Sequence, residues 1–145
     1  MDKLTVFLGG TCSTSTWRNE LLKKLNLEKI EAFNPVVENW TPECQLIEDD
    51  HRMHDDICLY VITPEAEGFY SFVEAVDDSN KRPDKTILCV LEEANGKKYT
   101  EHNLKGVLKT MKLVAENGAY VTSSLDNVSL RLNTLAEEKM KNHTK

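Results

Sequence analysis

The sequence of 145 residues predicts a single α/β domain, residues 1–145, in which helices cover both faces of a largely parallel sheet of about five strands. Two observations support this three-layer α/β/α sandwich. Short apolar runs alternate with segments of helical periodicity, and the runs are too continuously apolar for strands with one face in water. Because parallel strands need crossover connections, the alternation is typical of doubly wound sheets of the flavodoxin or Rossmann type.

Five apolar runs are the predicted strands. In chain order they are KLTVFL (3–8), IEAFN (30–34), ICLYVI (57–62), KTILCVL (85–91) and a weaker GAYVT (118–122). Cys58 and Cys89 lie inside two of the runs, and the four cysteines show no CxxC spacing. We therefore interpret these two as reduced core residues rather than as part of a disulfide framework.

Helical patterns fill the intervals between the strands and the C-terminal segment. The predicted helices are 16–26, 43–53, one that begins at Ser71, 103–118 and 124–141. Helix 43–53 is expected to turn Cys44, Ile47 and His51 inward and to leave most of its charges in solvent. Helix 103–118 is expected to end at Gly118 and to bury one face, made of Leu104, Val107, Leu108, Met111 and Val114.

Composition and charge limit the kinds of partner. Charged residues make up 29% of the chain, the formal net charge is -6, and no extended stripe of Lys and Arg is present. Nucleic acid and anionic membranes are therefore poor candidates. No apolar run approaches the ~20 residues of a membrane span, and the N-terminus lacks the apolar region of a signal peptide. We predict a cytoplasmic protein that acts on a small molecule, with no nucleic acid, membrane or cofactor as partner.

Three predicted strands are followed by loops rich in glycine, hydroxyl and carboxyl groups. These are GGTCSTSTW (9–17), NPVVENW (34–40) and EGFYSFVE (67–74). Since the carboxyl ends of parallel strands share one edge of the sheet, we expect the loops to converge on one cleft. The first loop has neither GxGxxG nor the lysine of a P-loop, so it is not a standard dinucleotide or triphosphate cradle.

Two alternatives remain open at this level. Ser71 and Glu74 fit the S-x-x-E pattern of a capping box, in which Glu74 would only stabilise the start of a helix. His51 and His54 lie among aspartates in EDDHRMHDD (48–56), which supplies residue types found in metal sites. If the first alternative holds, Glu74 has a structural role instead of a catalytic one. If the second holds, the protein is a metal-dependent hydrolase.

Taken together, the segments resemble the nucleoside 2-deoxyribosyltransferase-like family, including its small phage and bacterial members. The resemblance covers residues 4–92. It rests on VFLGGT with the following Trp17, on FNPVVENW, on Glu48 in the next helix, on Asp56 ahead of the third strand, and on Glu74.

This resemblance implies an enzyme that cleaves the N-glycosidic bond of a (deoxy)nucleoside or nucleotide. The deoxyribosyl group would pass to another base or to water through a covalent intermediate on Glu74, with Glu48 or the adjacent Asp49 as proton donor. By analogy with retaining glycosidases, the two carboxyl groups are expected about 5–5.5 Å apart. A binding module that has lost this chemistry is the alternative.

The resemblance also implies a substrate site and an assembly. No metal is predicted in the site, and the family's tendency to assemble implies a homo-oligomer. The residues expected to bind the substrate are Gly9, Gly10, Thr11, Trp17, Asn34, Trp40, Glu67, Tyr70 and Ser71.

Overall fold

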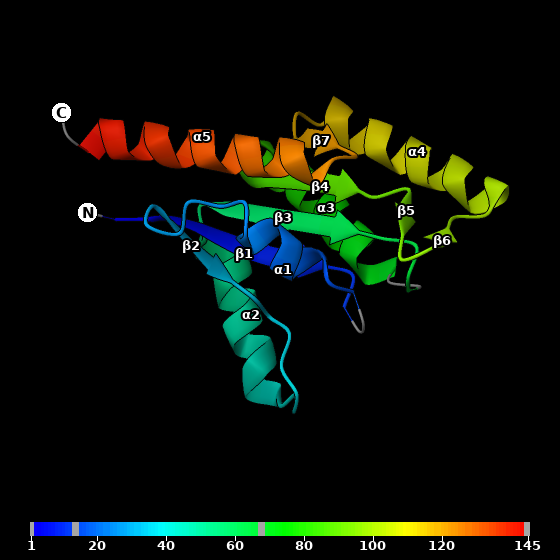
Figure 1. Ribbon diagram of the computed structural model, residues 1–145, viewed down its shortest axis with the longest axis horizontal. Coiled ribbons are helices and arrows are strands. Elements are labelled where there is room, and N and C mark those ends of the chain that lie inside the picture. Colours follow the sequence, from blue (N-terminus) through cyan, green and yellow to red (C-terminus); the bar gives the residue numbers. More distant parts are fainter. Residues whose placement is uncertain (1, 13–14, 67–68, 144–145) are drawn as a thin grey trace.

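Five parallel strands form the central sheet in the order β2-β1-β3-β4-β7 (Figure 1). The computed structural model describes residues 2–12, 15–66 and 69–143. It confirms the α/β class and the parallel sheet of five strands. The strands are β1 (Leu4–Gly10), β2 (Ile30–Phe33), β3 (Ile57–Ile62), β4 (Thr86–Val90) and β7 (Tyr120–Thr122).

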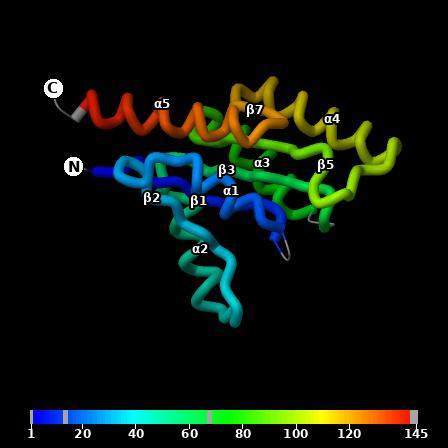
Figure 2. The backbone as a smooth tube through the Cα atoms, viewed as in Figure 1, coloured from blue at the N-terminus to red at the C-terminus, as the bar shows by residue number. Residues whose placement is uncertain are grey.

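Helices cover both faces of this sheet, and the two ends of the chain lie at the same side of the molecule (Figure 2). The helices are α1 (Trp17–Leu22), α2 (Pro42–His54), α3 (Phe69–Lys81), α4 (Glu101–Glu116) and α5 (Leu125–His143), with a 3-10 turn at Pro83–Lys85. None of the helices within the described ranges is both long and apolar enough to span a bilayer.

The core is divided by the sheet into two clusters. On one face, Leu21 of α1 and Leu132 of α5 pack with side chains of β1, β3 and β4. On the other face, Ala75 of α3 and Val114 of α4 pack against the opposite side chains of the same strands. Burial of β1, β3 and β4 from both sides explains why their sequences are continuously apolar. Cys58 and Cys89 are buried free thiols, as expected.

Helix α2 corrects one prediction about the core. Ile47 was expected to face inward, but 51% of its surface is exposed, and none of the residues of α2 is buried. The reason is that α2 projects from the edge of the sheet instead of lying along it (Figure 1). Leu108 on α4 is likewise exposed, so the buried face of that helix is narrower than its periodicity indicates.

Two further local predictions differ from the structure. Helix α3 begins at Phe69 rather than at Ser71, and α1 ends at Leu22, before the expected limit at residue 26.

A short antiparallel pair, β5 (Glu93–Ala94) and β6 (Lys97–Lys98), was not predicted. Its turn consists of Asn95 and Gly96 with φ values of 50° and 78°. An Asn-Gly pair is the strongest short-range signal for such a hairpin, so the sequence did contain the information.

The carboxyl ends of β1 and β3 meet at the point where the strand order reverses. The chain leaves β1 toward β2 on one side and returns to β3 on the other, so the loops that follow β1 and β3 diverge and leave a crevice between them. Gly10 ends β1 with a φ of 118°, and a Cβ atom there would lie 2.0 Å from the carbonyl oxygen of Val61. The close approach of these two backbones therefore requires glycine.

Replacing Gly10 by alanine is expected to destabilise the protein by about 3 kcal/mol or more, because the new methyl group overlaps backbone that has no room to move. Urea unfolding would measure the loss. Gly106→Ala is the matched control, since a Cβ at this helical position meets nothing within 4 Å. It should leave stability unchanged or raise it by up to about 1 kcal/mol. Equal stability of the two variants would contradict the assignment.

Candidate active site

A pocket of about 130 Å³ opens at the carboxyl end of β1. Its wall combines the end of β1 and the residues that follow it, the middle of α2 and the first part of α3. The lining residues are Phe7, Gly9, Gly10, Cys12, Arg18, Pro35, Gln45, Glu48, Asp49, Arg52, Ser71 and Glu74. The fold thus brings together six of the residues that the sequence predicted for the site, namely Gly9, Gly10, Glu48, Asp49, Ser71 and Glu74.

Glu74 projects from α3 into this pocket with 21% of its side chain exposed. The observed start of α3 decides between the two interpretations of this residue. A capping box needs Ser71 at the position just before the helix, but the helix already begins at Phe69 and Ser71 lies within its first turn. Glu74 therefore lies beyond the first turn, and end capping does not account for its place.

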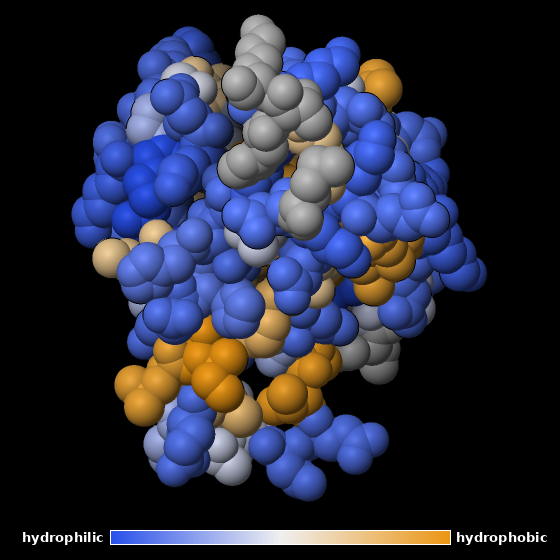
Figure 3. Space-filling view, turned by 90° about the vertical axis from the view of Figure 1, so that its left-hand side faces the viewer, coloured by the Kyte–Doolittle hydropathy of each residue, from blue (hydrophilic) through white to orange (hydrophobic). Residues whose placement is uncertain are grey.

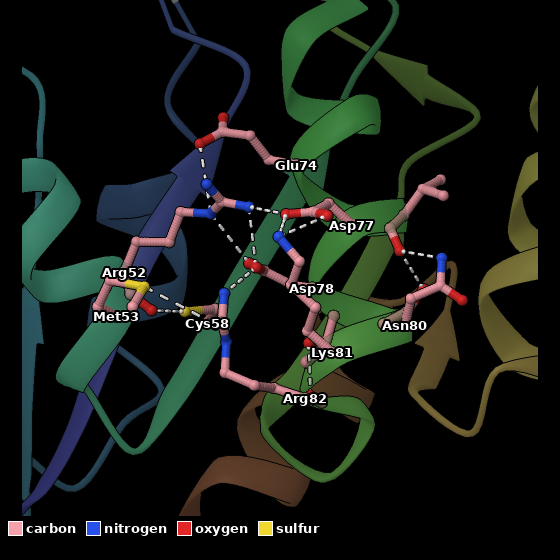
Figure 4. A network of polar contacts seen from close by, with 12 residues as sticks. Arg52, Met53, Cys58, Glu74, Asp77, Asp78, Asn80, Lys81 and Arg82 are labelled. Carbon is pink, nitrogen blue, oxygen red and sulfur yellow. Dashed lines mark hydrogen bonds and ion pairs between the residues drawn. The ribbon is translucent and has the colours of Figure 1, made fainter.

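A buried network of ion pairs holds α2 beside α3 (Figure 4). At its centre is Asp78, whose side chain is 0% exposed. Asp78 accepts a hydrogen bond from Nη2 of Arg52 at 2.9 Å and another from the hydroxyl of Tyr60 at 2.5 Å. It also pairs with Arg82. Arg52 in turn places its Nε atom 3.7 Å from Oε2 of Glu74.

Gly9 makes room for this network. A Cβ atom at Gly9 would lie 2.8 Å from the ring of Tyr60 and 2.9 Å from the ring of Phe7. The absent side chain therefore lets the Tyr60 ring lie close to β1 while its hydroxyl reaches Asp78. Arg52, Tyr60 and Asp78 were not predicted from the sequence as residues of the site. The one signal was Tyr60 inside an apolar strand, because a buried tyrosine hydroxyl needs a partner.

Comparison with known proteins identifies the family. A family model described as nucleoside 2-deoxyribosyltransferase like matches residues 3–94. The chain belongs to the nucleoside 2-deoxyribosyltransferase-like family. This confirms the resemblance found in the sequence, and the matched range contains every residue that lines the pocket. A search among curated proteins gave no match.

Several residues predicted to bind substrate in this deoxyribosyltransferase-like chain lie off the pocket wall. Trp17 is buried in the core, where its Nε1 donates to the carbonyl oxygen of Thr11 at 2.9 Å. Thr11 is also buried, and its hydroxyl oxygen accepts from the backbone N–H of Thr63 at 2.8 Å. Thr11 therefore ties the loop that follows β1 to the end of β3, and Trp17 ties the same loop to the start of α1.

The remaining predicted residues are on the surface. Asn34 is exposed and its side-chain oxygen accepts from the N–H of Val36 at 3.0 Å. Trp40 and Tyr70 are exposed and do not line the pocket. Glu67 lies outside the described residues.

Two glutamates of this deoxyribosyltransferase-like pocket, Glu48 and Glu74, have raised pKa values. Burial raises the pKa of Glu74 to about 7, although the positive charge of Arg52 opposes the rise. The negative charges of Asp78, Glu48 and Asp49 increase it further. The pKa of Glu48 is also raised, first by burial and then by the neighbouring Asp49. Perturbed acids that face one cleft are typical of functional sites.

The histidines proposed for a metal make other contacts. The ring of His51 stacks on Phe33 with centroids 3.7 Å apart, and its Nδ1 lies 3.0 Å from Asp55. His54 is exposed and pairs with Asp50. Over residues 2–12, 15–66 and 69–143, no three His, Cys, Asp or Glu side chains converge in a way that would hold a metal.

Proposed function

We propose that the protein cleaves the N-glycosidic bond of a 2-deoxyribonucleoside or its nucleotide and transfers the deoxyribosyl group to a second base or to water. The observation that carries the proposal is the position of Glu74. This carboxyl group lies in the pocket of a deoxyribosyltransferase-like fold, with a guanidinium 3.7 Å away and two further carboxyl groups on the same wall.

The reaction would proceed in two displacements, as in retaining glycoside hydrolysis. In the first, an oxygen of Glu74 attacks C1′ of the sugar, the bond from C1′ to the base nitrogen breaks, and Glu48 or Asp49 protonates the departing base. In the second, a nitrogen of the incoming base, or a water oxygen, attacks C1′ and releases Glu74. The proton of the attacking group then returns to Glu48 or Asp49.

Arg52 is a positioning residue in this scheme. Its guanidinium is held by Asp78 and Asp77, at 2.9 Å and 3.1 Å, so it cannot swing away from Glu74 without breaking both pairs. A fixed positive charge beside Glu74 favours the ionised carboxylate, which is the form that attacks. Glu74 then leaves the covalent intermediate as an anion that Arg52 also stabilises.

Activity should rise with pH through a midpoint near 7, because Glu74 must be ionised to attack and its pKa is raised to about 7. Below that midpoint, kcat/KM is expected to fall about tenfold per pH unit. A profile of initial rates from pH 5 to 9 in one mixed buffer would measure this. A rate that does not rise between pH 6 and 8 would contradict the role of Glu74 as the ionised nucleophile, whereas a decline at higher pH would report ionisation of the proton donor, Glu48 or Asp49.

The chain is also proposed to act as a homo-oligomer. The pocket is smaller than the ~300–1,000 Å³ of most small-molecule sites, so part of the substrate must extend beyond its wall. Beside it, apolar surface gathers over the projecting helix α2 (Figure 3). The exposed apolar side chains of α2 and the segment before it are Val36, Val37, Trp40, Leu46, Ile47 and Met53. Exposed apolar side chains that gather on one part of the surface are typical of interaction sites, and a second copy that covers them would deepen the pocket.

Ile47→Glu is expected to shift the protein to the monomer, because it places a charge within this apolar surface. Sedimentation or light scattering on a size-exclusion column would report the mass. Leu113→Glu on α4 is the control, since Leu113 is exposed to a similar degree and lies on another helix. A parent protein that is monomeric at every concentration would contradict the proposal.

Product analysis tests the proposed reaction itself. Purified protein is incubated with the common 2′-deoxynucleosides and their 5′-monophosphates, with and without a second free base, and the products are separated by chromatography. A new nucleoside that forms only with the acceptor base would establish transfer, whereas free base alone would establish hydrolysis. Substrates that bind and are never consumed would instead favour a binding module.

A further inference from the structure

Arg18 is a buried cation that has no carboxylate partner among the described residues. Only 5% of its surface is exposed. Its Nε donates to the carbonyl oxygen of Leu8 at 3.1 Å, and its Nη1 donates to that of Thr11 at 2.8 Å. The face of the guanidinium lies 4.4 Å from the centroid of the Trp17 ring.

The second terminal nitrogen of Arg18 is less well satisfied. Nη2 lies 3.4 Å from the carbonyl oxygen of Gly10 and 4.0 Å from Sγ of Cys12. Both contacts are long for hydrogen bonds, so this nitrogen retains donor capacity. Arg18 lines the pocket together with Gly10 and Cys12, at the end formed by the loop that follows β1.

The other arginines near the site differ in this respect. Arg52 and Arg82 both pair with Asp78, which balances their charge. Arg18 has carbonyl oxygens and a thiol instead, and burial lowers its pKa because the charge is poorly compensated. A buried charge without a counter-ion is unfavourable, so an anion that enters the pocket would restore the balance.

The wall of the pocket carries charges of both signs. Arg18 lines it beside the glycines that end β1, Glu48, Asp49 and Arg52 line it from α2, and Glu74 lines it from α3. A nucleoside 5′-monophosphate suits charges of both signs. Its phosphate is an anion, and its base becomes more basic as the glycosidic bond breaks.

We propose that Arg18 binds the 5′-phosphate of the substrate through Nη2, and that the protein therefore prefers deoxynucleoside 5′-monophosphates to deoxynucleosides. This inference rests on the proposed function for the sugar and the base. The phosphate contact itself needs only Arg18 and the pocket. Charge-assisted bonds from arginine to phosphate are among the stronger polar contacts in proteins.

Calorimetry on the Glu74→Gln protein measures the preference without turnover. Each common 2′-deoxynucleoside is compared with its 5′-monophosphate, and 2-deoxyribose 5-phosphate and inorganic phosphate serve as probes without a base. The monophosphate is expected to bind about 10- to 100-fold more tightly than the nucleoside. Tight binding of inorganic phosphate alone, with no gain from the attached sugar, would show an anion site unrelated to the substrate and overturn the proposal.

Substitutions assign the preference to Arg18. Arg18→Gln in the same background should reduce the ratio of the affinities for the monophosphate and the nucleoside to about threefold or less. Arg18→Lys should keep part of this ratio, because the charge remains. Lys23→Gln is the control, since it removes an exposed positive charge at the end of the same helix. It should leave the difference intact. If Arg18→Gln fails to fold, the comparison of Arg18→Lys with the parent still decides the matter.

The two proposals fail in different ways. If deoxynucleosides are cleaved and their monophosphates bind no better, the phosphate site is wrong and the glycosidic chemistry stands. If no nucleoside or nucleotide is cleaved, but 2-deoxyribose 5-phosphate binds in a way that depends on Arg18, the chemistry is wrong and the phosphate site stands.

Discussion

Glu74→Gln is expected to reduce turnover about 10³-fold or more, because the amide cannot attack C1′ and cannot leave as an anion. The side chain keeps its size, so the pocket keeps its shape. Single-turnover measurements with the best substrate from the product analysis would give the loss directly. Glu43→Gln is the control, since Glu43 is an exposed glutamate in the first turn of α2. A Glu74→Gln protein with more than a tenth of the parent activity would exclude the covalent mechanism.

The same substitution should not destabilise the protein, so a loss of activity in this variant could not be attributed to unfolding. The pKa of Glu74 rises from an ordinary value of 4.5 to about 7 in the folded state. The folded state therefore holds a proton that the unfolded chain releases, and stability declines as pH rises from about 4.5 to 7. Glutamine has no such penalty. Glu74→Gln should melt at the same temperature as the parent at pH 4 and at the same or a higher temperature at pH 8.

Asp78→Asn is expected to destabilise the protein by about 3–5 kcal/mol, because Arg52 and Arg82 would share a buried site that has lost its negative charge. Activity should fall as well, since Arg52 would lose the partner that fixes it beside Glu74. Urea unfolding measures the first effect, and kcat/KM at a temperature where the variant is folded measures the second.

Asp77→Asn is the matched control for this experiment. Asp77 precedes Asp78 on α3 and also pairs with Arg52, at 3.1 Å, but 39% of its side chain is exposed. Exposed ion pairs contribute little to stability, so no measurable change in the unfolding midpoint is expected. Similar losses in the two variants would show that burial does not decide the importance of these pairs.

The sheet could be predicted from the sequence because its strands are covered on both faces. A run such as ICLYVI (57–62) has no polar position that would suit a solvent-facing side, and β3 has the predicted limits. The convergence of loops at the carboxyl ends of the strands follows from parallel order alone. Glu48, Asp49 and Glu74 accordingly share a pocket, as the resemblance implied.

The rest of the site depends on contacts between distant residues. No sequence pattern around Arg52 or Asp78 indicates that these two residues form an ion pair. Both lie in charge-rich stretches that are equally typical of a solvated helix face. The prediction that Ile47 faces inward was wrong for a related reason. Helical periodicity assigns residues to faces, but it does not reveal whether the sheet extends far enough to cover one.

Arg52 also connects helix α2 to helix α3. It belongs to the projecting helix α2, while the carboxylate that it approaches belongs to α3. The loop after β1 is tied to the end of β3 by the hydrogen bond from the backbone N–H of Thr63 to Thr11, whereas α2 is tied to α3 by the ion pairs of Arg52. The positive charge of Arg52 lowers the pKa of Glu74, so the distance between the two side chains helps to set the pH at which this carboxyl group ionises. The ionisation of Glu74 is therefore coupled to the position of α2.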